Sequence, residues 1–145
     1  MLNYTNRRRK PILIAVFAIY IMIVLKLTVF RKNVYYPERQ LNLTLFLDLI
    51  RTFNKMGPVV FLRLFLGNIG WFVPFGFLLP LCTSKGNMRK TVLLGIAFSL
   101  TIEIAQFVLN KGVAELDDVI LNTLGTAAGY YLYRIIATKR FHRSQ

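Results

Sequence analysis

The chain contains four long apolar runs, and each has the ~20 residues that an α-helix needs to cross a bilayer core. A long segment, residues 31–63, separates the first two runs, and short polar stretches separate the others. The pattern predicts an all-α, polytopic integral membrane protein with a single domain over residues 1–145. The four expected transmembrane spans are residues 11–30, 64–82, 91–109 and 119–137.

The second run differs from the others because glycines and prolines interrupt it. Proline removes a backbone hydrogen bond and crowds the preceding turn of a helix. We therefore expect a helix that is kinked or partly unwound in its middle, with Pro74 and Gly76 in structural roles. The interrupting residues are Gly67, Gly70, Pro74, Gly76 and Pro80.

An amphipathic stretch lies between the first two runs. Phe46, Leu49, Ile50 and Phe53 recur at helical spacing, with polar residues opposite them. This spacing predicts a short outer helix that ends at Gly57-Pro58. Two placements stay open: a helix lying in the membrane interface, or a loop helix packed on the spans.

The net charge of +13 comes from basic residues that gather at the ends of the apolar runs. This placement disfavours a nucleic-acid partner and favours membrane lipids with anionic headgroups as the counter-charge. The densest clusters lie before the first span, between the second and third, and after the fourth. The positive-inside rule therefore predicts that both termini are cytoplasmic, although six basic residues in 31–63 weaken the asymmetry.

A polar stripe runs down the third expected helix. Ser99, Glu103, Gln106 and Asn110 are spaced i, i+4, i+7 and i+11, so they share one face. A carboxylate at membrane depth costs ~2.5–3.5 kcal/mol on insertion scales, so it should face the bundle interior or a wet cavity. The stripe therefore marks the interior face of this helix.

The fourth expected helix supplies facing groups at the same spacing. Asp118 and Asn122 precede Gly125 and Gly129, whose Gly-x-x-x-Gly pattern permits close packing of two helices. The short connection makes the third and fourth helices antiparallel neighbours, and Asn68 of the second lies at a similar depth. These polar residues are candidate binding groups, and simple interhelical hydrogen bonding is the alternative. Asp117 suits either the site or the start of the helix.

The sequence contains one cysteine and one histidine, Cys82 and His142. This composition excludes an intrachain disulfide and leaves no cluster with metal-ligand spacing. We therefore predict no metal site and no cofactor.

Three segments resemble the signature blocks of the VanZ-like family: NIGWFVPFGFLLP at 68–80, SLTIEIAQF at 99–107 and ELDDVILNTLGTAAG at 115–129. RQLNLTLF at 39–46 resembles a fourth block. Two positions depart from the family pattern: Leu45 replaces a frequent proline, and Lys111 with Gly112 replaces a frequent arginine. The resemblance implies a four-helix protein of the bacterial plasma membrane that lowers susceptibility to lipid-tailed glycopeptides of the teicoplanin type, or acts in cell-envelope maintenance.

The residues support two classes of mechanism. In the first, an outward-facing pocket binds a lipid, a lipid-linked wall precursor or a partner through Asn68, Glu103, Gln106, Asp118 and Asn122. In the second, an intramembrane enzyme uses Glu103 or Asp118 as general acid or base. We favour binding, because the sequence offers no Ser/His or Cys/His pair. A transporter is a third option, and homo-oligomerisation stays open.

Overall fold

The computed structural model describes residues 10–30, 35–83 and 86–142, with side chains to residue 138. The basic clusters used for orientation lie partly outside these ranges, at residues 7–9, Lys85 and Arg143. Five helices account for most of the fold, and two short strands complete it. The elements are α1 (Lys10–Thr28), β1 (Gln40–Asn42), α2 (Leu47–Met56), α3 (Pro58–Cys82), α4 (Met88–Val108), β2 (Val113–Glu115) and α5 (Leu116–His142).

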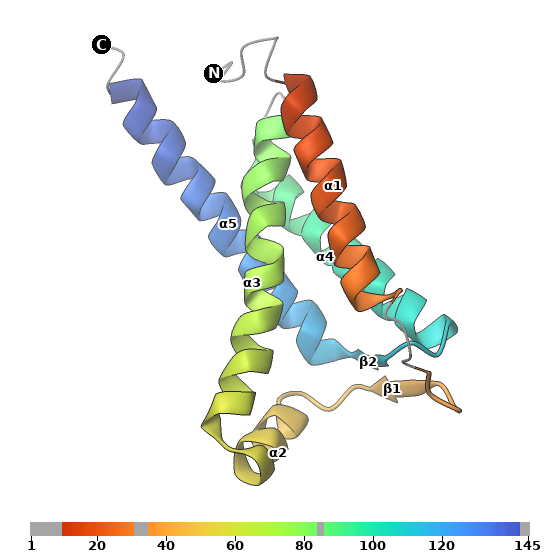
Figure 1. Ribbon diagram of the computed structural model, residues 1–145. Helices are drawn as coiled ribbons and strands as arrows, with labels where there is room; N and C mark the ends of the chain where they lie inside the picture. The colour runs from red at the N-terminus through yellow and green to blue at the C-terminus, as the bar shows by residue number, and fades with distance from the viewer. Residues whose placement is uncertain (1–9, 31–34, 84–85, 143–145) are drawn as a thin grey trace.

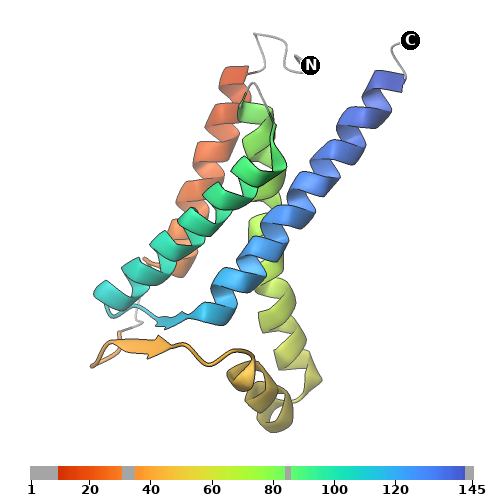
Figure 2. The ribbon, with the colours of Figure 1, turned by 180° about the vertical axis from the view of Figure 1, so that it is seen from behind.

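The four long helices alternate in direction along the chain (Figure 1). As a result α1 begins and α5 ends at the same end of the bundle, which we call the terminal end. The strands and α2 form a layer at the opposite end, which we call the sheet end (Figure 2).

Three of the described helices, α1, α3 and α4, are long and apolar enough to cross a membrane. Many of their large apolar side chains are exposed, as expected for surfaces that face lipid. Helix α5 is longer, but it carries two acids in its first turn, Arg134 near its other end, and several polar side chains between them. Its crossing therefore stays a prediction.

Helix α3 runs without interruption from Pro58 to Cys82, so the predicted unwinding is wrong. Each internal proline crowds the carbonyl group four residues earlier. A glycine stands at both of those positions, Gly70 before Pro74 and Gly76 before Pro80. Glycine has the backbone freedom to relieve this crowding, so the helix continues.

Helices α3 and α5 cross in backbone contact. A Cβ atom added at Gly125 would overlap the carbonyl group of Ile69, and one at Gly129 would overlap that of Val73. From the other side, a Cβ at Gly76 would overlap the carbonyl group of Thr126. The predicted close approach at the Gly-x-x-x-Gly is therefore confirmed, and α3 is the partner.

An aromatic core joins α1, α3 and α4. The Phe75 and Phe98 rings stack with centroids 5.3 Å apart, and Phe17 of α1 packs on Phe75. Val24 of α1 and Phe72 are fully buried beside them. This core holds α1 against α3 and α4, and the Tyr20 hydroxyl adds a hydrogen bond of 2.5 Å to the carbonyl oxygen of Trp71 on α3.

The sheet end contains an element that the sequence analysis missed. Strands β1 and β2 pair in parallel, with Leu41 opposite Ala114. The backbone N–H of Tyr36 also donates to the carbonyl oxygen of Asn110 at 3.0 Å. The segment between α1 and α2 is thus hydrogen-bonded to the connection between α4 and α5.

The predicted amphipathic helix forms as α2 and ends at Gly57, whose φ of 84° favours glycine. Phe53 packs edge-on against Phe61 of α3. Ile50 and Met56 nevertheless remain exposed. Helix α2 therefore packs on α3 and still presents an apolar surface, and its position at the membrane interface stays a prediction.

Candidate functional site

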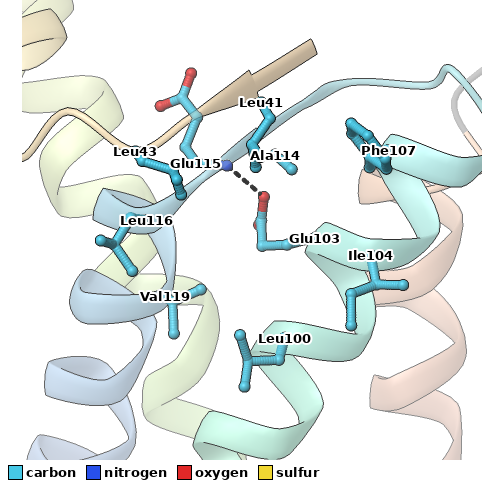
Figure 3. Close-up of a pocket in the computed structure, with 10 residues that line it drawn as sticks. All are labelled: Leu41, Leu43, Leu100, Glu103, Ile104, Phe107, Ala114, Glu115, Leu116 and Val119. Carbon is cyan, nitrogen blue, oxygen red and sulfur yellow. Dashed lines mark hydrogen bonds between the residues drawn. The ribbon is translucent and has the colours of Figure 1, made fainter. Parts of the chain in front are cut away.

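A pocket of about 210 Å³ lies where α4, α5 and the two strands meet (Figure 3). Apolar side chains form nearly all of its wall, and Leu41, Leu43 and Ile104 are more than half exposed. The pocket is therefore open to its surroundings on one side. Its lining residues are Leu41, Leu43, Leu100, Glu103, Ile104, Phe107, Ala114, Glu115, Leu116 and Val119.

Glu103 is the buried acid of this wall, with only 6% of its surface exposed. Its carboxylate accepts a hydrogen bond of 2.9 Å from the backbone N–H of Glu115 (Figure 3). Among the described residues this is the one hydrogen bond to the Glu103 side chain. The second carboxylate oxygen therefore remains available to a bound molecule.

The Glu115 side chain points away from Glu103, on the other side of the strand (Figure 3). Partial burial, together with the nearby carboxylates of Asp118, Asp48 and Asp117, raises the pKa of its carboxyl group to about 7, and burial is the largest cause. Five of the six acidic residues of this basic protein, all except Glu38, thus interact electrostatically with one another at the sheet end.

This raised pKa predicts a pH-dependent stability. Between the ordinary pKa of 4.5 and the folded value of about 7, the folded state binds more protons than the unfolded state. Stability should therefore be highest at low pH and fall as pH rises through 7. Thermal unfolding in detergent at pH 5, 6, 7 and 8 measures this slope. Glu115→Gln should flatten it, whereas Glu38→Gln, at an exposed acid, should leave it unchanged.

Two of the predicted site residues connect helices. Asn122 is 6% exposed and donates to the Ser99 hydroxyl at 2.9 Å, which joins α5 to α4. Gln106 is 8% exposed and donates to the carbonyl oxygen of Thr28 at 3.3 Å, which joins α4 to α1. The burial of Ser99, Glu103 and Gln106 confirms that their part of the polar stripe faces the interior, whereas Asn110 lies beyond the end of α4 and is half-buried. Asn122 and Gln106 both act as interhelical hydrogen-bond donors.

The acids that open α5 hold other segments in place. Asn68 of α3 donates a hydrogen bond to Asp118. The Asp117 carboxylate accepts from the backbone N–H of Phe46 at 2.9 and 3.0 Å, where Phe46 has a left-handed φ of 56°. Asp117 therefore fixes the turn that leads into α2. This tie also places Leu43 over the pocket.

Of the five predicted binding residues, the structure places Glu103 in the pocket wall and the other four in hydrogen bonds near it. The sequence analysis did not predict that Leu41 and Leu43, from the segment between α1 and α2, form part of the apolar lining. Leu41 and Leu43 alternate with Asn42 and Thr44, which is the period-2 pattern of a strand. That alternation was the available signal, but it covers too few residues to indicate what the strand would pair with.

A cation also lies beside the pocket. The Arg39 guanidinium sits 5.8 Å from the centre of the Phe107 ring, within the range of a cation–π contact. Phe107 lines the pocket. A molecule entering here would thus meet apolar walls, a buried carboxylate and a guanidinium close to the mouth.

Comparisons with known proteins identify relatives by sequence. Residues 14–137 match the family described as VanZ/LLP1. Protein VanZ of Enterococcus faecium is 34% identical over 98 residues, which cover 68% of this chain and 55% of that protein. The chain thus spans about half the length of this relative. No solved structure matches the chain. Since the family match covers most of the sequence and includes every element that builds the pocket, the chain belongs to the VanZ/LLP1 family.

Proposed function

We propose that this protein contributes to resistance against glycopeptide antibiotics of the teicoplanin type, or to maintenance of the cell envelope. It does so by binding an amphiphilic molecule, a membrane lipid or a lipid-linked wall precursor, in the pocket at Glu103. Binding changes how the antibiotic or its target is presented at the membrane surface. Family membership and the relative named VanZ support the biological role.

The observation that carries the proposal is a buried carboxylate in the wall of an otherwise apolar pocket. Leu100, Ile104 and Val119 suit an acyl chain, while Glu103 offers a free oxygen to a polar headgroup. At about 210 Å³ the pocket is smaller than the ~300–1,000 Å³ typical of small-molecule sites. It therefore accepts one part of an amphiphile, and the rest extends into the bilayer through the open side.

The proposed setting is the bacterial plasma membrane, with four spans, α5 as the fourth, and both termini in the cytoplasm. The sheet end then faces outward, toward wall precursors and antibiotic. Helix α2 lies in the outer interface with Ile50, Phe53 and Met56 toward lipid. The basic clusters and the shared end of α1 and α5 support this orientation.

Filling the pocket tests the proposal. Ile104→Trp should abolish protection of a susceptible host from a lipid-tailed glycopeptide, because the larger ring occupies the space for the ligand. Leu93→Trp is the matched control: it lies on the same helix with 64% exposure, against 61% for Ile104, and outside the pocket. Growth inhibition is measured at equal protein levels. Full protection by Ile104→Trp would exclude this pocket.

The second candidate is an intramembrane enzyme acting on a lipid-linked envelope substrate, with Glu103 and Asp118 as acid and base. The gathering of carboxylates at the sheet end favours it, because clustered acids can take separate acid and base roles. Purified protein that converts a lipid-linked precursor, and loses this turnover in Asp118→Asn, would establish the enzyme. Stoichiometric binding without product favours the binding protein.

A further inference from the structure

A second hollow lies at the terminal end of the bundle, far from the Glu103 pocket. It has a volume of about 700 Å³ and lies between the first turn of α4 and the last turns of α5. Helix α5 diverges from the other helices toward this end (Figures 1 and 2). The lining residues are Met88, Tyr130, Tyr131, Arg134, Ile135 and Thr138.

The depth of this hollow corresponds to a membrane surface. Helix α4 is long and apolar enough to span, and Met88 is its first residue. Arg134 lies 18 residues after Leu116, which at 1.5 Å per residue places it about 27 Å along α5. This length is close to the ~30 Å of a bilayer core. Tyr130 and Tyr131 beside it suit the aromatic belt at headgroup level.

The charge at this hollow is positive. Arg134 is exposed and forms no ion pair with any residue the structure describes. Arg89 and Lys90, both exposed, follow Met88 directly in the first turn of α4. The start of a helix also carries the positive end of the helix dipole. A negatively charged group is therefore favoured at the mouth of the hollow.

Two neighbouring hydroxyl groups are already engaged. The Tyr130 hydroxyl donates to the carbonyl oxygen of Gly86 at 3.2 Å, and the Thr138 hydroxyl donates to the carbonyl oxygen of Arg134 at 2.9 Å. The Arg134 guanidinium and the exposed Tyr131 hydroxyl thus retain free donors, and the guanidinium presents them in a fork that matches phosphate oxygens. Tyr131 and Ile135, both exposed, extend the apolar surface along the same helix.

We infer that this hollow binds an anionic phospholipid, with the headgroup phosphate at Arg134 and the acyl chains against Tyr131 and Ile135. Basic pockets between transmembrane helices recognise anionic headgroups in this way. The bound lipid fills the wedge between α4 and α5, so it stabilises the divergence of α5. The inference is independent of the ligand at Glu103, since the two sites lie at opposite ends of the bundle.

The test uses the full chain in detergent, with dioleoylphosphatidylglycerol or dioleoylphosphatidylcholine added. The melting temperature and the lipid retained in native mass spectrometry are measured. Phosphatidylglycerol should stabilise the wild type more than phosphatidylcholine. Arg134→Gln should weaken phosphatidylglycerol binding about fivefold, equivalent to ~1 kcal/mol for one cation near the surface. Arg63→Gln, an exposed arginine on α3 outside the hollow, should bind as the wild type does.

Arg134→Lys distinguishes a loss of lipid binding from a loss of folding. It keeps the charge and should retain a preference for phosphatidylglycerol, although a weaker one because lysine lacks the fork. Inorganic phosphate alone should give no comparable stabilisation, since it leaves the apolar part of the hollow empty. Equal effects of both lipids on the wild type would overturn the inference. So would unchanged phosphatidylglycerol binding in Arg134→Gln, or full replacement of the lipid by inorganic phosphate.

Discussion

Gly125→Ala should lower the yield of folded protein, and Gly125→Leu should lower it further. Even a single added Cβ would overlap the backbone of Ile69, and backbone cannot rotate away as a side chain can. Overpacking of this kind costs about 1–3 kcal/mol where neighbours can adjust, and a backbone contact lies at the upper end. The same holds for Gly129 against Val73. Fluorescence-detected size exclusion and thermal aggregation in detergent measure the loss.

Gly67→Ala is the matched control on α3. An added Cβ there meets nothing within 4 Å, so the substitution should keep or slightly raise stability. Alanine is favoured over glycine inside a helix by about 0.8–1 kcal/mol. If Gly125→Ala and Gly67→Ala both behaved as the wild type, the α3–α5 crossing would have to be looser than the structure describes.

Glu103→Gln should fold and insert normally but reduce glycopeptide protection to the level of cells without the protein. The glutamine carbonyl oxygen can still accept the hydrogen bond from the Glu115 N–H, so the anchor of β2 is kept. The substitution removes the ability of this side chain to ionise and to exchange a proton. A ligand or reaction that needs the carboxylate therefore fails while the fold survives. Growth inhibition and detergent melting temperature report the two effects separately.

The matched control is Glu38→Gln, which removes the one acid that is not part of the group of interacting acids. It should protect cells as the wild type does. Normal protection by Glu103→Gln would instead identify Glu103 as a structural hydrogen-bonding group that anchors β2 to α4. In that case the pocket-filling variant Ile104→Trp would decide whether the pocket still matters.

The helical elements could largely be predicted because their signals are local. Continuous apolar runs predicted α1 and α4 to within three residues at each end, and the i, i+3, i+4 pattern identified α2. The end of α3 was also predicted, but its start, at Pro58, lies six residues before the predicted one. Glycine spacing on α5 predicted a close helix contact, because small residues repeated at this spacing let two helix backbones approach closely. The continuity of α3 was not predicted, because it depends on which residue stands four positions before each proline.

The sequence by itself determined that Glu103 faces the interior, because exposing a carboxylate of an apolar helix to the lipid of a bilayer costs too much free energy. Only the tertiary structure decided what surrounds it. The wall formed by Leu41 and Leu43 depends on the pairing of β1 with β2, which lie about 70 residues apart and have three residues each. Helix signals arise from hydrogen bonds within one segment. A short parallel strand pair has no such internal signal, so its register is set only when Asp117, Phe46 and the ends of α4 and α5 come together.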